Sequence, residues 1–143
     1  MAISSRFSVA VHILSLLEVS RGARITSDYI AGSVSTNPVV IRRLMSMLSR
    51  AGLVVTTPGV AGATLARPAE QITLLDIYRA VQADEAGGLF TLHEKPNPKC
   101  TVGRGIQSTL DASFSRAQSA MERELDSMTL AEIVRDLSCE DPT

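Results

Sequence analysis

The chain of 143 residues has little of what builds disulfide frameworks or cysteine-rich metal sites. It contains two cysteines, Cys100 and Cys139, and no CxxC pair, which argues against both. Aromatic residues make up only 3% of the sequence, so aliphatic packing between helices is the expected source of stability. No run of about 18 apolar residues and no signal-peptide pattern is present. We therefore expect a cytoplasmic protein that does not associate with membranes.

Acidic residues are absent between Asp28 and Glu70, although the net charge of the whole chain is only −1. Residues 1–69 carry seven arginines and two acids, or +5, whereas residues 70–143 carry seven basic and thirteen acidic residues, or −6. Phosphate binding depends on local arginine density and is opposed by nearby carboxylates. This segregation favours a first half that faces a polyanion, with chance clustering on a solvated surface as the alternative.

Residues 34–67 contain the pattern on which the functional prediction depends. Asn37 is a suitable N-cap, and Pro38 suits the first position of a helix. Apolar residues recur at helical spacing on one side of this helix: Ile41, Leu44, Met45 and Leu48. The opposite side is mainly polar and cationic: Val39, Arg42, Arg43, Ser46 and Arg50. The helix can therefore bury one side in a core and present guanidinium groups to a DNA groove.

A two-stranded wing is predicted directly after this helix. The sequence from 53 to 57 is β-branched and extended, residues 58–62 supply turn-forming proline and glycine, and residues 63–67 can return as a second strand. Two helices are predicted upstream, one over residues 4–20 and a short one over residues 25–31 that turns Tyr29, Ile30 and Val34 inward. The fold class is therefore mainly α with a small β-wing (α+β), a winged helix-turn-helix.

A capping box at Thr73 and Asp76 predicts one more helix after the wing. Beyond it, a continuous apolar stripe follows helical spacing: Ile106, Leu110, Phe114, Ala117, Met121 and Leu125. A long helix joined to a domain that has its own core needs another surface to cover this stripe. A second copy of the chain is the economical cover, and packing back on its own domain is the alternative. The predicted division is a winged helix-turn-helix domain at 1–83, a sensor or linker loop at 84–103, and a dimerisation helix with a short C-terminal helix at 104–143.

In their order along the chain, several motifs resemble the Rrf2 type of bacterial transcription regulator. They are Ser5-Arg6-Phe7, Ile41-Arg42-Arg43-Leu44, Ala51-Gly52-Leu53-Val54, Gly59-Val60-Ala61-Gly62-Ala63, Leu65-Ala66-Arg67-Pro68 and Ile72-Thr73-Leu74-Leu75-Asp76-Ile77. The resemblance covers nearly the whole chain. It implies a dimeric winged-helix DNA-binding protein, usually a repressor, in which the long C-terminal helix crosses its partner.

The resemblance also implies that residues 35–43 and the wing at 57–62 meet DNA. The first turn of the first helix offers hydroxyl, guanidinium and backbone N–H groups, which can contact a phosphate or serve only to cap the helix. The predicted DNA-binding residues are therefore Ser4, Arg6, Ser35, Thr36, Asn37, Pro38, Val39, Arg42, Arg43, Thr57, Gly59 and Gly62.

Many members of that family hold an iron–sulfur cluster on three closely spaced cysteines in the loop before the long helix. Here that loop contains only Cys100, and one thiolate cannot build a cysteine-ligated cluster. Residues 93–103 resemble the cluster-free branch, so no cluster, metal or other cofactor is expected. With Lys99 beside it and Arg104 nearby, Cys100 can be a reactive sensor thiolate. The alternatives are an inert buried thiol and a member of a small-molecule pocket.

The leading functional hypothesis is a dimeric, sequence-specific repressor that binds a double-stranded DNA operator and responds to a thiol-reactive oxidant or a small molecule. One alternative is a small enzyme that uses Cys100 with His93 as its base. No group to orient that base and no oxyanion loop is evident, so enzymatic activity is not expected. The other alternative, a winged helix that binds only proteins, leaves the missing acids of the first half unexplained.

Overall fold

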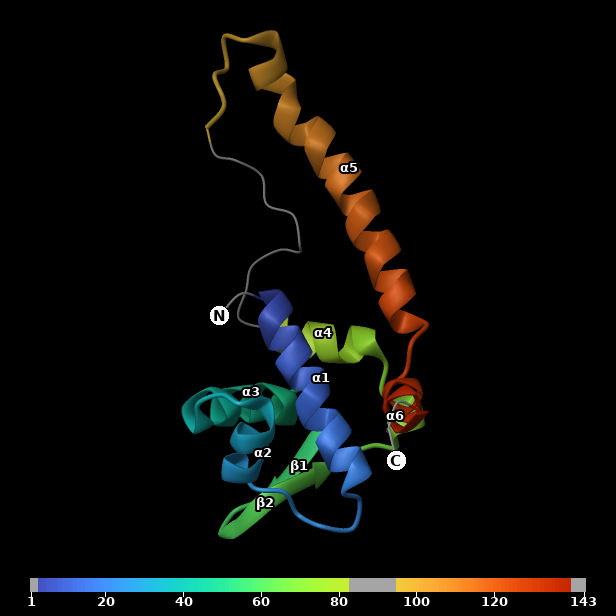
Figure 1. Ribbon diagram of the computed structural model, residues 1–143. Coiled ribbons are helices and arrows are strands. Elements are labelled where there is room, and N and C mark those ends of the chain that lie inside the picture. Colours follow the sequence, from blue (N-terminus) through green and yellow to red (C-terminus); the bar gives the residue numbers. More distant parts are fainter. Residues whose placement is uncertain (1–2, 83–94, 140–143) are drawn as a thin grey trace.

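The structure, a computed structural model, describes residues 3–82 and 95–139. Figure 1 shows a helical body that carries a small β-hairpin and from which one long helix extends away. The elements, in chain order, are α1 (Ile3–Val19), α2 (Ser27–Val34), α3 (Pro38–Arg50), β1 (Val54–Thr57), β2 (Val60–Leu65), η1 (Ala69–Gln71), α4 (Leu74–Gln82), α5 (Thr101–Asp126) and α6 (Leu130–Cys139). The predicted class, mainly α with a small β-wing, is confirmed.

Two helices of the body begin at the capping side chains that the sequence predicts. Asn37 Oδ1 accepts a hydrogen bond of 2.7 Å from the backbone N–H group of Val39. Thr73 and Asp76 form the capping box before α4, in which each side chain accepts the other residue's N–H group, at 3.0 and 3.1 Å. Because these bonds satisfy N–H groups that a helix leaves free, they fix where α3 and α4 start.

The short helix α2 was predicted over residues 25–31 but spans Ser27–Val34, and it also differs from its prediction in one side chain. Thr26 is its N-cap, and the residues it buries are Ile30 and Ala31, whereas Tyr29 is 59% exposed. The prediction that Tyr29 turns inward is therefore wrong. A helix of 8 residues has room for only a narrow buried side, and the α1 and α3 helices that pack on it take the side that contains Ile30.

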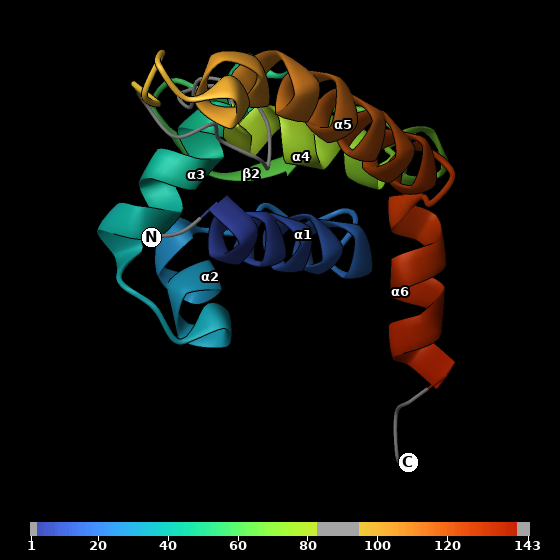
Figure 2. The same cartoon turned by 90° about the horizontal axis from the view of Figure 1, so that it is seen from above.

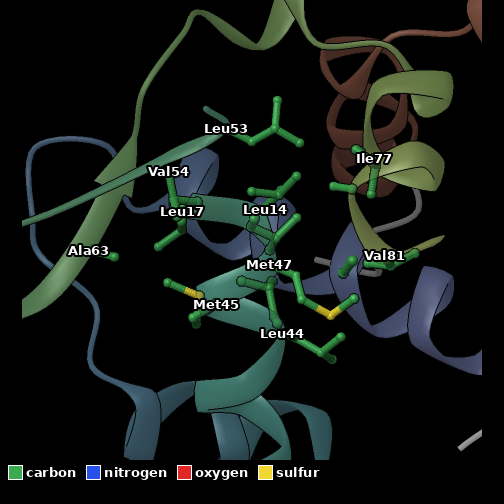
Figure 3. Close-up of a cluster of buried hydrophobic side chains, with 14 of the residues drawn as sticks. Leu14, Leu17, Leu44, Met45, Met47, Leu53, Val54, Ala63, Ile77 and Val81 are labelled. Atoms are coloured by element: carbon green, nitrogen blue, oxygen red, sulfur yellow. The ribbon is translucent and has the colours of Figure 1, made fainter. Parts of the chain in front are cut away.

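The core lies between α1, α3, α4 and the base of the hairpin (Figure 3). The predicted apolar side of α3 is buried, and Ile41 and Leu48 are fully buried. Met47 is also buried, although it lies off the predicted stripe, because α4 covers that flank of α3. One side of α3 is therefore fixed against the body, which leaves the other side exposed.

The wing is a tighter hairpin than the sequence predicts. A two-residue turn at Pro58 and Gly59 joins β1 to β2. Gly59 has a φ of 79°, which the position after proline in a type II turn requires and which glycine adopts without strain. The predicted five-residue turn at 58–62 is too long, since the second strand begins at Val60 and not at residue 63.

The long helix α5 runs from the body to a distant end, with its C-terminal half beside α4 (Figures 1 and 2). Tyr78 Oη and Gln118 Nε2 lie 3.4 Å apart, and Arg79 pairs with Glu122 at 3.5 Å. No residue of α5 is classed as buried in this single chain. None of the helices in the described ranges has the length and apolar content needed to cross a bilayer.

Candidate nucleic-acid interface

The outward side of α3 is exposed and cationic. Val39 is 62% exposed, and Arg42, Arg43, Ser46 and Arg50 are also exposed. The three arginines make no ion pair with any residue in the described ranges. This arrangement follows from the sequence, since the opposite side of the same helix is held in the core. The guanidinium groups are therefore available to an anionic ligand.

The turn before α3 and the first residue of that helix place four more predicted residues beside this surface. Ser35 and Asn37 are exposed, while Thr36 and Pro38 are partly buried. Ser35 has a φ of 63° and ends α2 in the left-handed conformation. Since Asn37 Oδ1 already accepts the capping bond, its amide NH₂ group is the part of the side chain that remains free to donate. That geometry suits a phosphate oxygen, which only accepts hydrogen bonds.

A groove of about 430 Å³ lies between α3 and the wing. Arg42 and Arg50 supply its cationic groups, and hydroxyl side chains supply its donors: Ser27, Ser46, Ser49 and Thr56. No acidic residue is among the described residues that line it. Sequence reasoning missed Ser27, Ser49 and Thr56 as members of this surface. The acid-free segment is a sequence signal for Ser49 and Thr56 only, since Ser27 precedes Asp28 and lies outside it.

The tip of the wing is exposed beyond this groove. Thr57 and Gly59 are exposed, Val60 is 49% exposed, and Gly62 is partly buried. Figure 1 shows the hairpin projecting past α2 at the edge of the body. The predicted wing residues thus lie next to the cationic side of α3, with the groove between them.

The first turn of α1 is not part of this surface. Arg6 is 7% exposed, in contrast to the arginines of α3, and Ser4 lies in the same turn. Figure 1 places this end of α1 away from the wing. The structure therefore does not bring Arg6 together with the other predicted DNA-binding residues.

Cys100 is the N-cap residue of α5, and Figure 1 shows that the N-terminal end of this helix lies far from the wing. The thiol is exposed, so the alternative of an inert buried thiol does not describe it in this chain. Its Sγ atom makes no capping hydrogen bond. The backbone N–H groups of Gly103 and Val102 nevertheless lower the pKa of the Cys100 thiol below its ordinary value, because they favour the thiolate.

The apolar stripe of α5 is only partly covered. Its members Ile106, Leu110, Phe114, Met121 and Leu125 are partly buried, and Ala117 is exposed. Of these, Leu125 packs against the core. His93, the base of the hypothetical enzyme, lies outside the described residues. Within the described ranges, no group of three His, Cys, Asp or Glu side chains could hold a metal ion.

Comparison with known proteins identifies what this arrangement resembles. The family model described as "Rrf2: Iron-dependent Transcriptional regulator" matches residues 3–136. YwnA of Bacillus subtilis, provisionally named an HTH-type transcriptional regulator, is 48% identical over 135 residues, which cover 94% of this chain and 98% of YwnA. A second protein of B. subtilis with the same provisional description, YwgB, is 37% identical over 84 residues, covering 57% of this chain and 54% of YwgB.

Solved structures share the fold. A crystal structure provisionally described as a DNA-binding protein has 43% sequence identity and a TM-score of 0.73, covering 90% of this chain and 97% of its own. CymR, described as the global cysteine regulator of B. subtilis, has 23% identity and a TM-score of 0.66, covering 94% of this chain and 97% of CymR. At that identity, the likeness to CymR concerns the fold alone.

Proposed function

The chain belongs to the Rrf2 family of bacterial transcription regulators, and on that premise we propose that it is a homodimer that binds double-stranded DNA operators and represses transcription. The observation that carries the proposal is the α3 surface, where three exposed arginines and an acid-free groove face outward. A surface of that kind matches a phosphate-lined groove in charge. Since bacterial DNA is cytoplasmic, we propose that the protein acts in the cytoplasm. We expect a DNA-binding protein of this kind to catalyse no reaction.

The proposed complex uses each part of the surface differently. The N-terminal half of α3 enters the major groove, where Arg42 and Arg43 can donate to guanine and Val39 can contact a thymine methyl group. The hydroxyl-lined groove receives the phosphate backbone that borders the major groove. The wing at Thr57 and Gly59 then lies against the adjacent minor groove or its backbone.

The dimer is proposed to form through α5. Its apolar stripe runs from Ile106 to Leu125 and lacks full cover in the single chain. A two-fold interface presents the same stripe from both copies, so each covers the other. The same symmetry presents two copies of α3 to the two half-sites of an operator.

The proposed signal acts without an iron–sulfur cluster. Cys100 lies at the start of α5 and Cys139 is the last residue of α6. Figure 1 shows α6 beside the body, far from the start of α5. Two separated cysteines do not fit a cluster that needs several neighbouring thiolates. An oxidant or another thiol-reactive compound that meets Cys100, or a small molecule bound near it, is the effector class we propose.

The test is operator binding by fluorescence anisotropy, with the operator first selected from random duplexes. We expect affinity to fall steeply as salt rises from about 50 to about 200 mM. Arg43→Ala should weaken binding at least about tenfold and relax the base preference, since an arginine–guanine pair contributes about 1–3 kcal/mol. Arg135→Ala, which removes an exposed charge on α6, is the matched control. Absence of duplex binding at low salt, or equal losses in the two variants, would refute the proposal.

A further inference from the structure

We infer that Arg24 is a positioning residue that holds the wing in the orientation in which it reads DNA. Arg24 lies in the loop between α1 and α2 and is exposed, so charge alone would class it with the arginines available to phosphate. Its guanidinium group is instead directed to the wing. The DNA step of this inference rests on the function proposed above, whereas the contact with the wing does not.

Two hydrogen bonds join the guanidinium group to the second strand of the wing. Arg24 Nε donates to the carbonyl oxygen of Ala61 at 3.2 Å, and one terminal nitrogen donates to that of Gly62 at 3.0 Å. Both acceptors are backbone atoms, so the contact depends on the path of the strand and not on a particular side chain. A planar guanidinium fork can satisfy two successive carbonyls at once, and an ammonium group is a less well-matched donor.

These carbonyls lie where the hairpin itself leaves a gap. Thr56 pairs with Ala63 and Thr57 pairs with Val60, and this change of register leaves Ala61 and Gly62 without partners in β1. An unpaired bulge bends a strand and changes the direction of the residues beyond it. Arg24 occupies this position from outside the hairpin, so it fixes the segment that determines where the tip points.

The backbone beside Arg24 extends the same contact. Ile25 and Ala63 form an isolated antiparallel bridge with hydrogen bonds of 3.3 and 3.1 Å. A two-stranded hairpin is only marginally stable by itself. The loop before α2 therefore pairs with the wing like a short third strand, with Arg24 over the bulge and Ile25 paired next to it.

Gly62 shows how closely the two segments approach. A Cβ atom on Gly62 would lie 2.8 Å from the Cβ atom of Arg24, and the φ of Gly62 is 89°. Both the space and the backbone conformation therefore require glycine at this bulge. Gly62→Ala would displace Arg24 from the wing, so this substitution should break the Arg24 contact without changing Arg24 itself.

The first arm of the test needs no DNA. Hydrogen exchange measured on the full chain should show the Ile25 and Ala63 amides exchanging about tenfold faster in Arg24→Ala, because two exposed hydrogen bonds are lost. Amides in the middle of α3 should be unchanged. Arg21→Ala removes the same charge from the same loop, but Arg21 pairs with Glu18 and not with the wing, so it is the matched control. Unchanged exchange in Arg24→Ala would overturn the inference.

The second arm uses the selected operator. Hydroxyl-radical footprinting, which reports on the sugars of the minor groove, should show that Arg24→Ala and Gly62→Ala lose the protection that the wing gives there. Protection of guanine N7 from dimethyl sulfate, which reports on the major groove, should persist in both variants. Arg24→Lys keeps the positive charge but lacks the planar guanidinium group, so its protection of the minor groove should be little better than that of Arg24→Ala. Full recovery in Arg24→Lys would overturn the positioning role in favour of a phosphate contact.

The two arms also separate this inference from the proposed function. A wild-type chain that binds no duplex would refute the proposed function, and with it the DNA step, while the exchange experiment would still decide whether Arg24 holds the wing. A wild-type chain that binds duplex without protecting the flanking minor groove would overturn the DNA step alone.

Discussion

Asn37 caps α3 and is proposed to contact DNA, and one pair of substitutions can separate these two roles. Its side-chain oxygen caps α3 by accepting the Val39 N–H group at 2.7 Å, and its exposed position lies beside the proposed DNA surface. Asn37→Ala removes the cap, which should lower the free energy of unfolding by about 1 kcal/mol. Asn37→Asp keeps an equivalent acceptor and adds a negative charge at the positive end of the helix dipole, which should offset any loss.

The effect of Asn37→Asp on DNA affinity should have the opposite sign. Each added negative charge cancels roughly one of the counterions released on binding, and with a salt slope of about 0.9 per charge this corresponds to about eightfold weaker binding per subunit in 0.1 M salt, or about sixtyfold for the proposed dimer. The order of stability should therefore be Asp at least equal to Asn and above Ala. The order of operator affinity should place Asp last.

Both orders can be measured on the same preparations. The chain contains no tryptophan, so urea unfolding is followed by far-UV circular dichroism at one fixed protein concentration, and operator binding by anisotropy of a labelled duplex. If Asn37→Ala unfolds like the wild type, the cap does not stabilise α3 as argued. If Asn37→Asp binds the operator as tightly as Asn, the N-terminus of α3 does not lie near phosphates.

Two further predictions concern the other end of the molecule. Phe114→Asp places a carboxylate in the apolar stripe of α5 and should raise the dimer dissociation constant about thirtyfold or more in sedimentation equilibrium, whereas Ser115→Asp, exposed on the same helix, should not. In a Cys139→Ser background, alkylation of Cys100 should reach half its maximal rate at a lower pH than a free cysteine thiol, since backbone N–H groups lower its pKa. The pKa of the Cys100 thiol is lower in the folded chain than in the unfolded chain. The thiolate therefore stabilises the fold at pH values above the unfolded-state pKa, and this stabilisation is lost as the pH falls through the folded-state pKa.

The cationic side of α3 could be predicted from the sequence because its determinants are local. The cap at Asn37, the proline after it and the spacing from Ile41 to Leu48 lie within one helix, and together they specify which side is buried. The exposure of Arg42 and Arg43 follows from that assignment. The capping box at Thr73 is local in the same way, and it begins α4 as predicted.

The features that were missed depend on segments distant in the chain. Arg24 and Ala61 are separated by 37 positions, and no local pattern connects an arginine before α2 to a bulge in the wing. The turn was predicted too long because glycine at 62 resembles a turn residue, although its conformation serves a bulge inside β2. The hydroxyls of the groove were missed for the same reason, since Ser27 and Thr56 meet α3 only through the tertiary fold.

The junction between α4 and α6 links the proposed dimer helix to the DNA-binding body. The Leu74 N–H group donates to the carbonyl of Met128 at 2.9 Å, and the Leu130 N–H group donates to that of Ile72 at 2.8 Å. These bonds tie the starts of α4 and α6 to each other directly after the end of α5. Because α6 also packs on α1, the end of α5 is held at two places on the body. A dimer built on α5 would therefore hold its two copies of α3 at a set separation, which is what two half-sites on one face of a duplex require.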